Sequence, residues 1–223
     1  MSLSMNIKLV IFDVNQTMFS LGEIEKSFLK NKLKKELVEV WFNSVLKEGF
    51  AYSLSGKYID FLSIGINELK KIFLQNRKPF TEELIRNIMK RFEYLEVHDD
   101  IKKSLKLLKK KKIRVVTLTN GSDENTKKLL QRNGLDNYVE RCFSINKIKI
   151  WKPHKEVYLD TCKMMKTKKE NTLMVAVHGW DINGAKLAGL KTAFISRYEK
   201  MVSGFYITPD FSAENVYEIV KKL

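Results

Sequence analysis

The 223-residue sequence lacks the features of a membrane protein and of a disulfide-rich protein. No apolar run approaches the roughly 20 residues that a membrane-spanning helix needs, and the N-terminal residues do not have the pattern of a signal peptide. The two cysteines, Cys142 and Cys162, show no CxxC spacing, so neither a zinc site nor a redox motif is expected. These absences predict a soluble, cytoplasmic protein with no membrane partner.

The sequence is also short of acidic residues. It has 26 Asp and Glu against 41 Lys and Arg, which gives a formal net charge of +15 and attracts anions. The basic residues are mostly lysines at positions typical of solvated helix faces, and no helix-turn-helix, zinc-finger or aromatic RNA-binding signature accompanies them. Nucleic acid is therefore not expected as a partner, whereas a homodimer is left open.

Apolar patterns divide the chain into a helical part and an alternating part. Residues 8–12 form a continuous apolar run after one lysine, as in a parallel strand that is covered on both faces. The region from 21 to 94 shows apolar residues at helical spacing and no convincing strand. After residue 96, helical patterns alternate with short strand patterns, and the last helix is expected over 213–223. The expected strands lie at 113–118, 142–145, 173–177 and 193–195.

This alternation predicts an α/β fold with a Rossmann-like, doubly wound parallel sheet. Residues 1–20 and 96–223 would form the sheet domain, and residues 21–95 an inserted all-helical domain. In such sheets, ligands bind just outside the carboxyl ends of the strands. Four polar clusters fall at this edge, and together they form a plausible catalytic site. The clusters are residues 13–17, 119–122, 152–153 and 178–181.

The four clusters resemble the motifs of the haloacid dehalogenase-like superfamily, and the likeness covers nearly the whole chain. Members of that superfamily carry a nucleophilic Asp after the first strand, a Ser or Thr after the second, a Lys before a later helix and an acidic loop after the next strand. Asp13, Thr119, Lys152 and Asp181 occupy those places here. The insertion resembles the helical cap domain that closes over the site in this superfamily.

Within the superfamily, the sequence is most similar to the 2-haloacid dehalogenases. TLTNGS resembles their strand-end SNGS, WKPHKEVY their YKPxxxVY, and VHGWDINGAKLAG their WDxxGAxxxG loop. The resemblance implies a hydrolase that uses Asp13 as a covalent nucleophile on a small anionic substrate and forms an aspartyl ester. The implied catalytic residues are Asp13, Thr17, Lys152 and Asp181. The implied substrate-binding residues are Asn15, Phe42, Thr119, Asn120, Tyr158 and His178.

The chemistry of several side chains fits these roles. An ammonium group from Lys152 within a few ångströms would favour the ionised form of Asp13. Asp181 would hold Lys152 in place or position a water molecule; the alternative is that it caps the following helix. For His178, a general base for ester hydrolysis and a histidine with all its hydrogen bonds satisfied at a strand end are both open.

Asn15 separates this sequence from the phosphatases of the superfamily, which have a second Asp as general acid at that place. Asn cannot transfer a proton near neutral pH, and losing general acid catalysis costs about 10²- to 10⁴-fold in rate. The acidic magnesium ligand of the phosphatases is also replaced, by Ala176 or Val177. No cofactor is therefore expected. A weak magnesium-dependent phosphatase is kept as an alternative, and its metal ligands would be Asp13, Asn15 and Asp181.

The sequence also departs from the dehalogenases at three places. Those enzymes have an aromatic residue where Asn15 stands, a halide-binding Arg where Phe42 stands and an Asn where His178 stands. Losing one preorganised donor that stabilises charge costs about 10²- to 10³-fold in rate. These departures leave a third alternative, which is a non-catalytic ligand-binding or interaction protein on the same fold.

Overall fold

The computed structural model describes residues 6–223, and a six-stranded sheet forms the centre of this part of the chain. The strand order is β3-β2-β1-β4-β5-β6, and every neighbouring pair is parallel. All four residues of the central strand β1 are buried, as expected for a parallel strand covered on both faces. The predicted doubly wound α/β fold is confirmed. The strands are β1 (Leu9–Phe12), β2 (Arg114–Thr119), β3 (Arg141–Ser144), β4 (Thr172–Ala176), β5 (Lys191–Ile195) and β6 (Phe211–Ala213).

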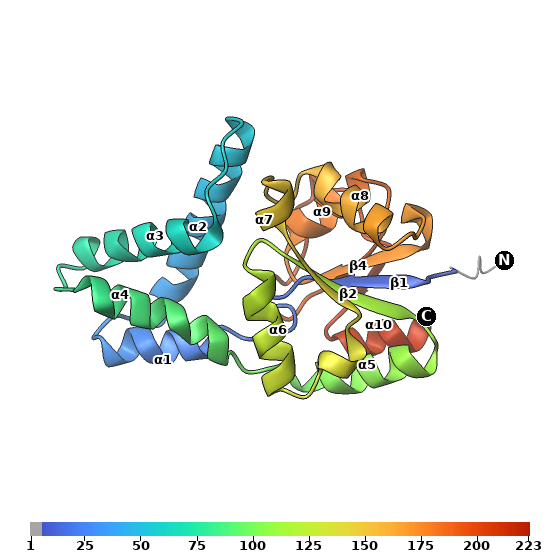
Figure 1. Cartoon of the computed structure of the whole chain (residues 1–223), viewed down its shortest axis with the longest axis horizontal. Coiled ribbons are helices and arrows are strands. Elements are labelled where there is room, and N and C mark those ends of the chain that lie inside the picture. The colour runs from blue at the N-terminus through green and yellow to red at the C-terminus, as the bar shows by residue number, and fades with distance from the viewer. Residues whose placement is uncertain (1–5) are drawn as a thin grey trace.

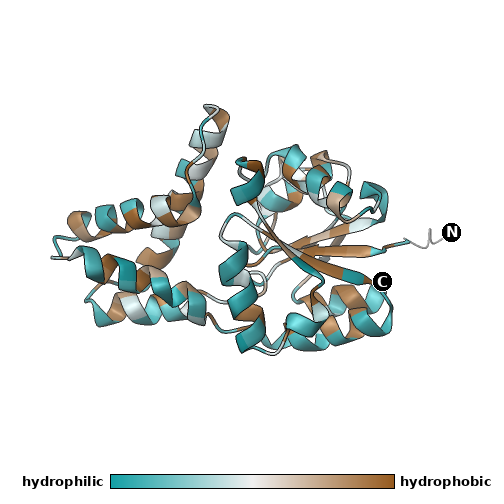
Figure 2. Cartoon of the chain, in the orientation of Figure 1, coloured by the Kyte–Doolittle hydropathy of each residue, from teal (hydrophilic) through white to brown (hydrophobic). Residues whose placement is uncertain are grey.

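Helices cover both faces of this sheet. They are α5 (Asp99–Lys110), α6 (Asp123–Arg132), α7 (Ile145–Ile148), α8 (Lys155–Met164), α9 (Gly179–Leu187) and α10 (Val216–Lys222), with short 3₁₀ turns η2 (Asp136–Tyr138) and η3 (Lys169–Asn171). Helices α5 and α10 pack together on one side of the sheet, and α8 and α9 pack together on the other (Figure 1). In Figure 2 the strands are largely brown and the outer faces of these helices teal, so the apolar core lies between the sheet and its helices.

The insertion between β1 and α5 is entirely helical and stands beside the sheet (Figure 1). It consists of α1 (Gly22–Lys30), α2 (Leu37–Leu54), α3 (Phe61–Gln75), α4 (Glu82–Met89) and the 3₁₀ helix η1 (Lys90–Tyr94). Trp41 is fully buried in it and contacts Phe28 and Phe92, with ring centroids 6.3 and 5.8 Å apart. Such aromatic contacts pack these helices against one another, and their buried residues belong to the same apolar cluster as those of the sheet.

The chain leaves the sheet and returns to it through two adjacent segments. The Ser20 N–H donates to the carbonyl oxygen of Glu96 at 2.9 Å, and the His98 N–H donates to that of Met18 at 3.0 Å. These contacts lie at the predicted boundary between the two domains. The division into two domains stays a prediction, and its first range begins with residues 1–5, which lie outside the described residues.

Trp151 joins the sheet part of the chain to the insertion. Its backbone N–H donates to Ser53 Oγ at 3.0 Å, and its indole Nε1 donates to the Ile59 carbonyl oxygen at 3.0 Å. Gly49 of α2 packs directly against the indole, and a Cβ atom at that position would overlap the ring. The segment from α2 to α3 is therefore held against the residue that precedes Lys152.

The sequence prediction was wrong at the C-terminal end of the sheet. Residue 213 ends strand β6 and does not begin a helix, because Phe211–Ala213 pairs in parallel with β5. The last helix starts at Val216, where Asn215 Oδ1 accepts the Glu218 N–H at 3.1 Å. In residues 6–223, no helix is both long enough and apolar enough to cross a membrane.

Candidate active site

Asp13 lies immediately after the central strand β1. Because β1 pairs with β2 on one side and β4 on the other, its carboxyl end is in the middle of the sheet edge. The Asp13 N–H donates to the Val175 carbonyl oxygen at 3.0 Å, and only 5% of the residue is exposed. The fold thus presents a buried carboxylate at the edge where sheets of this kind bind ligands.

Lys152 is the cationic partner of Asp13. Its side chain is fully buried, and Nζ donates to Asp13 Oδ1 at 2.9 Å, to Asp181 Oδ2 at 2.6 Å and to the Leu118 carbonyl oxygen at 3.1 Å. These three acceptors use all three N–H bonds of an ammonium group. Burial acts to lower the pKa of Lys152, but the charges of Asp13 and Asp181 outweigh it and raise that pKa. Lys152 is therefore held in its charged form.

The ionised form of Asp13 is further stabilised by Thr17. The Thr17 hydroxyl donates to Asp13 Oδ2 at 2.7 Å and accepts the Val177 N–H at 3.1 Å, which fixes the direction of the hydroxyl proton. Burial acts to raise the pKa of Asp13, but the charge of the Lys152 ammonium and the hydrogen bond from Thr17 hold it well below its usual range. Asp13 is consequently a carboxylate at neutral pH, as a nucleophile must be.

Asp181 anchors Lys152 and does not cap a helix. It is the third residue of α9, is fully buried, and accepts the Tyr158 hydroxyl on Oδ1 at 2.6 Å while Lys152 occupies Oδ2. The N-cap position belongs to His178, whose side chain makes no capping hydrogen bond. The N-cap alternative for Asp181 is therefore wrong. Burial, together with the charge of Asp13, raises the pKa of Asp181 against the opposing charge of Lys152.

The loop after β2 brings Thr119 and Asn120 to the same edge. Thr119 Oγ1 accepts the Gly121 N–H at 2.9 Å, and Asn120 Oδ1 accepts the backbone N–H of Lys152 at 3.0 Å. The Asn120 side chain therefore helps to position the segment that carries Lys152. Its Nδ2 is buried and has no hydrogen-bond partner among the residues that the structure describes.

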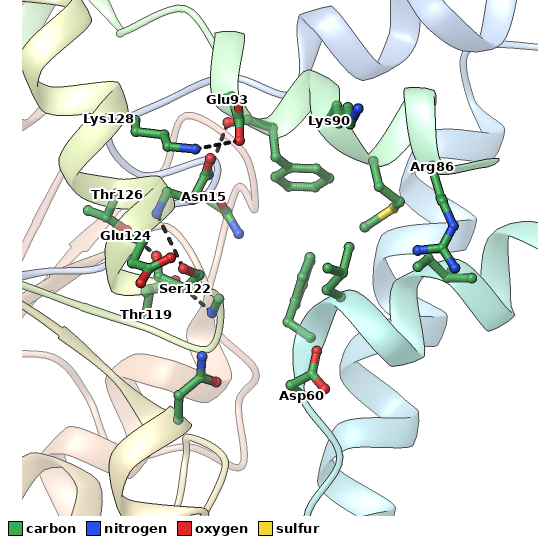
Figure 3. A pocket seen from close by; sticks show the side chains of 18 residues that line it. Asn15, Asp60, Arg86, Lys90, Glu93, Thr119, Ser122, Glu124, Thr126 and Lys128 are labelled. Atoms are coloured by element: carbon green, nitrogen blue, oxygen red, sulfur yellow. Dashed lines mark hydrogen bonds and ion pairs between the residues drawn. The ribbon is translucent and has the colours of Figure 1, made fainter. Parts of the chain in front are cut away.

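A cavity of about 310 Å³ lies between the insertion and this edge of the sheet (Figure 3). Asn15, Thr119 and the first residues of α6 form one wall, and side chains of α3, α4 and η1 form the other, among them Phe61 and Phe92. Arg86 lies on the insertion side, across the cavity from Asn15. Asp13 itself is not among the lining residues, and the cavity reaches the loop after β1 at Asn15.

A sequence model of the family described as haloacid dehalogenase-like hydrolase matches residues 7–189, from β1 to just beyond α9. The chain belongs to this family. Haloacetate dehalogenase H-2 of Moraxella sp. (strain B) is 24% identical to it over 216 residues, which are 96% of each chain. (S)-2-Haloacid dehalogenase 1 of Pseudomonas sp. (strain CBS-3) is 26% identical over 166 residues, which are 74% of this chain and 73% of the relative.

Solved structures show the same fold for this haloacid dehalogenase-like hydrolase. The L-2-haloacid dehalogenase of Xanthobacter autotrophicus matches 96% of the chain, and 97% of its own length, with a TM-score of 0.90 at 19% identity. The predicted superfamily and the prediction of a hydrolase are confirmed by the family match. The roles assigned to individual residues stay predictions.

Magnesium does not fit this haloacid dehalogenase-like site. Two of the three ligands predicted for it, Asp13 and Asp181, share the Lys152 ammonium, and both oxygens of Asp181 already accept hydrogen bonds from the protein. Ala176 and Val177, where a phosphatase has its further acid, are buried and apolar. Mg²⁺ requires near-octahedral oxygen coordination. Within residues 6–223, no cluster of three or more His, Cys, Asp and Glu side chains could hold a metal ion.

The six predicted substrate-binding residues of this haloacid dehalogenase-like hydrolase divide into three pairs. Asn15 and Thr119 line the cavity. Asn120 and Tyr158 contact the residues around Lys152, as described above. Phe42 and His178 contact each other: their rings are 6.1 Å apart and nearly parallel, with an angle of 27° between them. Phe42 therefore packs on a side chain of the site and is not part of the cavity wall.

Sequence analysis missed Gln16. This residue follows Asn15 in the loop after β1, has a left-handed φ of 63°, and its Oε1 lies 2.8 Å from His178 Nε2. A left-handed backbone is uncommon for a residue other than glycine, and none of the motifs quoted above for the haloacid dehalogenase-like hydrolases marks the position. Its place inside the first polar cluster was the one available signal.

Proposed function

We propose that this protein is a 2-haloacid dehalogenase that works through an ester of Asp13, with neither a metal ion nor a proton donor for the leaving group. The observation that carries the proposal is the arrangement around Lys152. Its ammonium balances the negative charge of Asp13 and is held by Asp181, which in turn accepts the Tyr158 hydroxyl. The names of the similar proteins, haloacetate dehalogenase H-2 and (S)-2-haloacid dehalogenase 1, support the same substrate class.

In the first step, a carboxylate oxygen of Asp13 attacks the carbon that bears the halogen. The carbon–oxygen bond forms as the carbon–halogen bond breaks, and the halide leaves with the bonding electron pair. Because halide leaves without a proton, the step needs no general acid, and Asn15 is no obstacle to it. Lys152 contributes by keeping Asp13 ionised in a buried site.

In the second step, water attacks Cγ of the Asp13 ester. The bond between Cγ and the substrate oxygen breaks, and one proton of the water passes to that oxygen to give a 2-hydroxy acid. The other proton is lost to solvent as the carboxylate is restored. The oxygen atom of the attacking water therefore remains on Asp13. The charge that develops on the carboxyl group in this step lies beside Lys152 and Thr17, which already donate to both of its oxygens.

The cavity offers a binding site for such a substrate. Thr119 and the start of α6 lie on one wall, where the positive end of the helix favours the substrate carboxylate against the opposing charge of Glu124. Phe61 and Phe92 face that wall and suit the apolar part of the substrate. With a volume of about 310 Å³, the cavity exceeds the size of a two-carbon haloacid, so the proposal extends to acids with longer carbon chains.

Phosphate ester hydrolysis is disfavoured by two features of the same site. Its alcohol leaving group needs a proton, which Asn15 cannot supply, and this loss alone costs about 10²- to 10⁴-fold in rate. The magnesium ion that would assist has no suitable set of ligands around Asp13 and Asp181.

A panel of 2-chloro and 2-bromo acids of two to six carbons tests the proposal, with phosphate esters in parallel and with or without Mg²⁺. We expect halide release that does not depend on Mg²⁺ and that is lost in Asp13→Asn. A single turnover in heavy-oxygen water should leave one heavy oxygen on Asp13. The proposal is refuted if no acid of the panel releases halide, or if halide is released and Asp13 stays unlabelled.

A further inference from the structure

His178 lies beside the proposed nucleophile with one ring nitrogen unused. The residue follows β4, is 4% exposed, and its Nδ1 is 3.4 Å from Asp13 Oδ2. Among the described residues, no group forms a hydrogen bond with this nitrogen. A buried polar atom without a partner is uncommon and calls for an explanation, and here it is directed at the carboxylate on which the ester forms.

The Gln16 side chain lies against one ring nitrogen of His178 and leaves the other facing Asp13. Gln16 Oε1 lies 2.8 Å from His178 Nε2, and an amide oxygen is an acceptor, so this contact favours the tautomer with hydrogen on Nε2 and a lone pair on Nδ1. Gln16 holds this position with a left-handed φ of 63°, while its carbonyl oxygen is 3.1 Å from His98 Nε2. A backbone conformation of this kind persists only where its surroundings support it, and it is often found at functional sites.

Aromatic rings fix the plane of the imidazole. Phe42 and Trp180 stack on it with centroids 6.1 and 5.3 Å away, and Tyr198 meets it edge-on at 5.9 Å. Two titratable groups contact His178: Asp13, through its carboxylate, and Tyr198, through its ring. The Trp180 ring also lies 5.6 Å from Lys152 Nζ, so the ammonium of the site and the imidazole both contact this indole.

We propose that His178 Nδ1 is the general base that takes a proton from the water attacking the Asp13 ester. This inference rests on the proposed function. The water oxygen bonds to Cγ as its proton passes to Nδ1, and the resulting imidazolium returns the proton to the departing substrate oxygen as the ester bond breaks. The second proton of the water leaves the Asp13 carboxyl group for solvent, so each turnover restores both the carboxylate and the neutral ring.

Two departures from the dehalogenase pattern are linked by this assignment. An Asn in place of His178 can hold a water molecule but cannot accept its proton near neutral pH. The change to His178 therefore adds a base, and Phe42, from the distant helix α2, supplies one face of the site that holds its ring. An arginine at Phe42 would place a cation against the imidazole and oppose formation of the imidazolium.

The test separates the two chemical steps in the His178→Asn variant. The enzyme is mixed with excess (S)-2-chloropropionate and quenched with acid after short times; halide is measured in solution and the ester by the mass of the intact protein. We expect the first turnover to release halide within a few-fold of the wild-type rate. The ester should then persist, so that steady-state turnover falls about 10²- to 10⁴-fold. In the wild type, little ester should accumulate.

His154→Asn is the matched control. His154 is exposed and caps α8 by accepting the Glu156 N–H at 3.4 Å, and Asn also caps helices well. This variant should behave as the wild type in both steps. Ester accumulation in both variants would show an effect that is not specific to His178 and would overturn the assignment.

Gln16→Asn provides a second variant, which decides the question if His178→Asn does not fold. Asn tolerates a left-handed backbone but is one methylene too short to reach Nε2, so the ester should accumulate here too. The assignment is overturned if the ester in a folded His178→Asn variant, or failing that in Gln16→Asn, is hydrolysed at the wild-type rate. Absence of halide release from the wild type would instead refute the proposed function, and this assignment with it.

Discussion

Replacing Lys152 with methionine tests the charge balance of the site. Methionine is similar in length but removes the ammonium group and its three hydrogen bonds, which leaves Asp13 Oδ1 and Asp181 Oδ2 without their cation. All three side chains are almost wholly buried, and breaking a buried ion pair by removing one partner costs about 3 to 5 kcal/mol. We expect the free energy of unfolding at pH 7 to fall by about this amount, and halide release to be lost.

The loss of stability should depend on pH in a direction set by Asp13. In the wild type, the pKa of Asp13 is depressed, so the stability it contributes is present above its unfolded pKa of about 4 and is lost only as the pH falls through the lower folded pKa. Without the ammonium, burial dominates and raises the pKa of Asp13 above the unfolded value. The variant should therefore recover part of the lost stability as the pH falls from 7 toward 5.

Urea unfolding at pH 7 and pH 5 measures both effects. Lys163→Met is the control, because Lys163 lies exposed on α8 and its loss should change stability by less than about 0.5 kcal/mol. The reasoning is refuted if Lys152→Met loses less than about 1 kcal/mol at pH 7, or if its loss is the same at both pH values.

Two further substitutions test other parts of the structure. Asn15→Asp restores the general acid of phosphatases but leaves both oxygens of Asp181 occupied by hydrogen bonds. The variant should therefore not hydrolyse p-nitrophenyl phosphate, even with Mg²⁺. A strong rise in this phosphatase activity would contradict the account of the metal ligands. Gly49→Ala should lower the free energy of unfolding by about 1 to 3 kcal/mol, because the new Cβ overlaps the Trp151 indole. Gly204→Ala is the control and should leave stability unchanged, because a Cβ there meets nothing within 4 Å. Equal urea midpoints for the two variants would contradict this prediction.

The position of the site could be predicted because a parallel sheet gathers the ends of its strands. Asp13 follows a strand that is apolar and wholly buried, a pattern that a single sequence displays directly. The loops with Thr119 and Lys152 follow from the same alternation of strand and helix. Two roles for Asp181 were compatible with its sequence position, and the exact start of α9, which places His178 at the N-cap, excluded the capping role.

Other features depend on contacts that leave no local pattern. Strand β6 is three residues long and becomes a strand by pairing with β5, so its sequence is not that of an apolar strand. Phe42 could be recognised as a departure from a family pattern, but its packing on His178 joins residues far apart in the chain. Gln16 has a backbone conformation that its residue type does not predict.

The hydrogen bond between Ser20 and Glu96 bears on whether the helical insertion can be replaced by another segment. Because the chain leaves and re-enters the sheet at neighbouring points, the insertion between Ser20 and Glu96 is a long loop whose two ends are held together by the core. Another segment with ends equally close would impose a similar entropic cost and leave β1 and Asp13 where they are. The cavity wall that α3, α4 and η1 supply can therefore vary without moving β1, whereas Phe42 and the contacts with Trp151 tie the insertion to the reactive side chains.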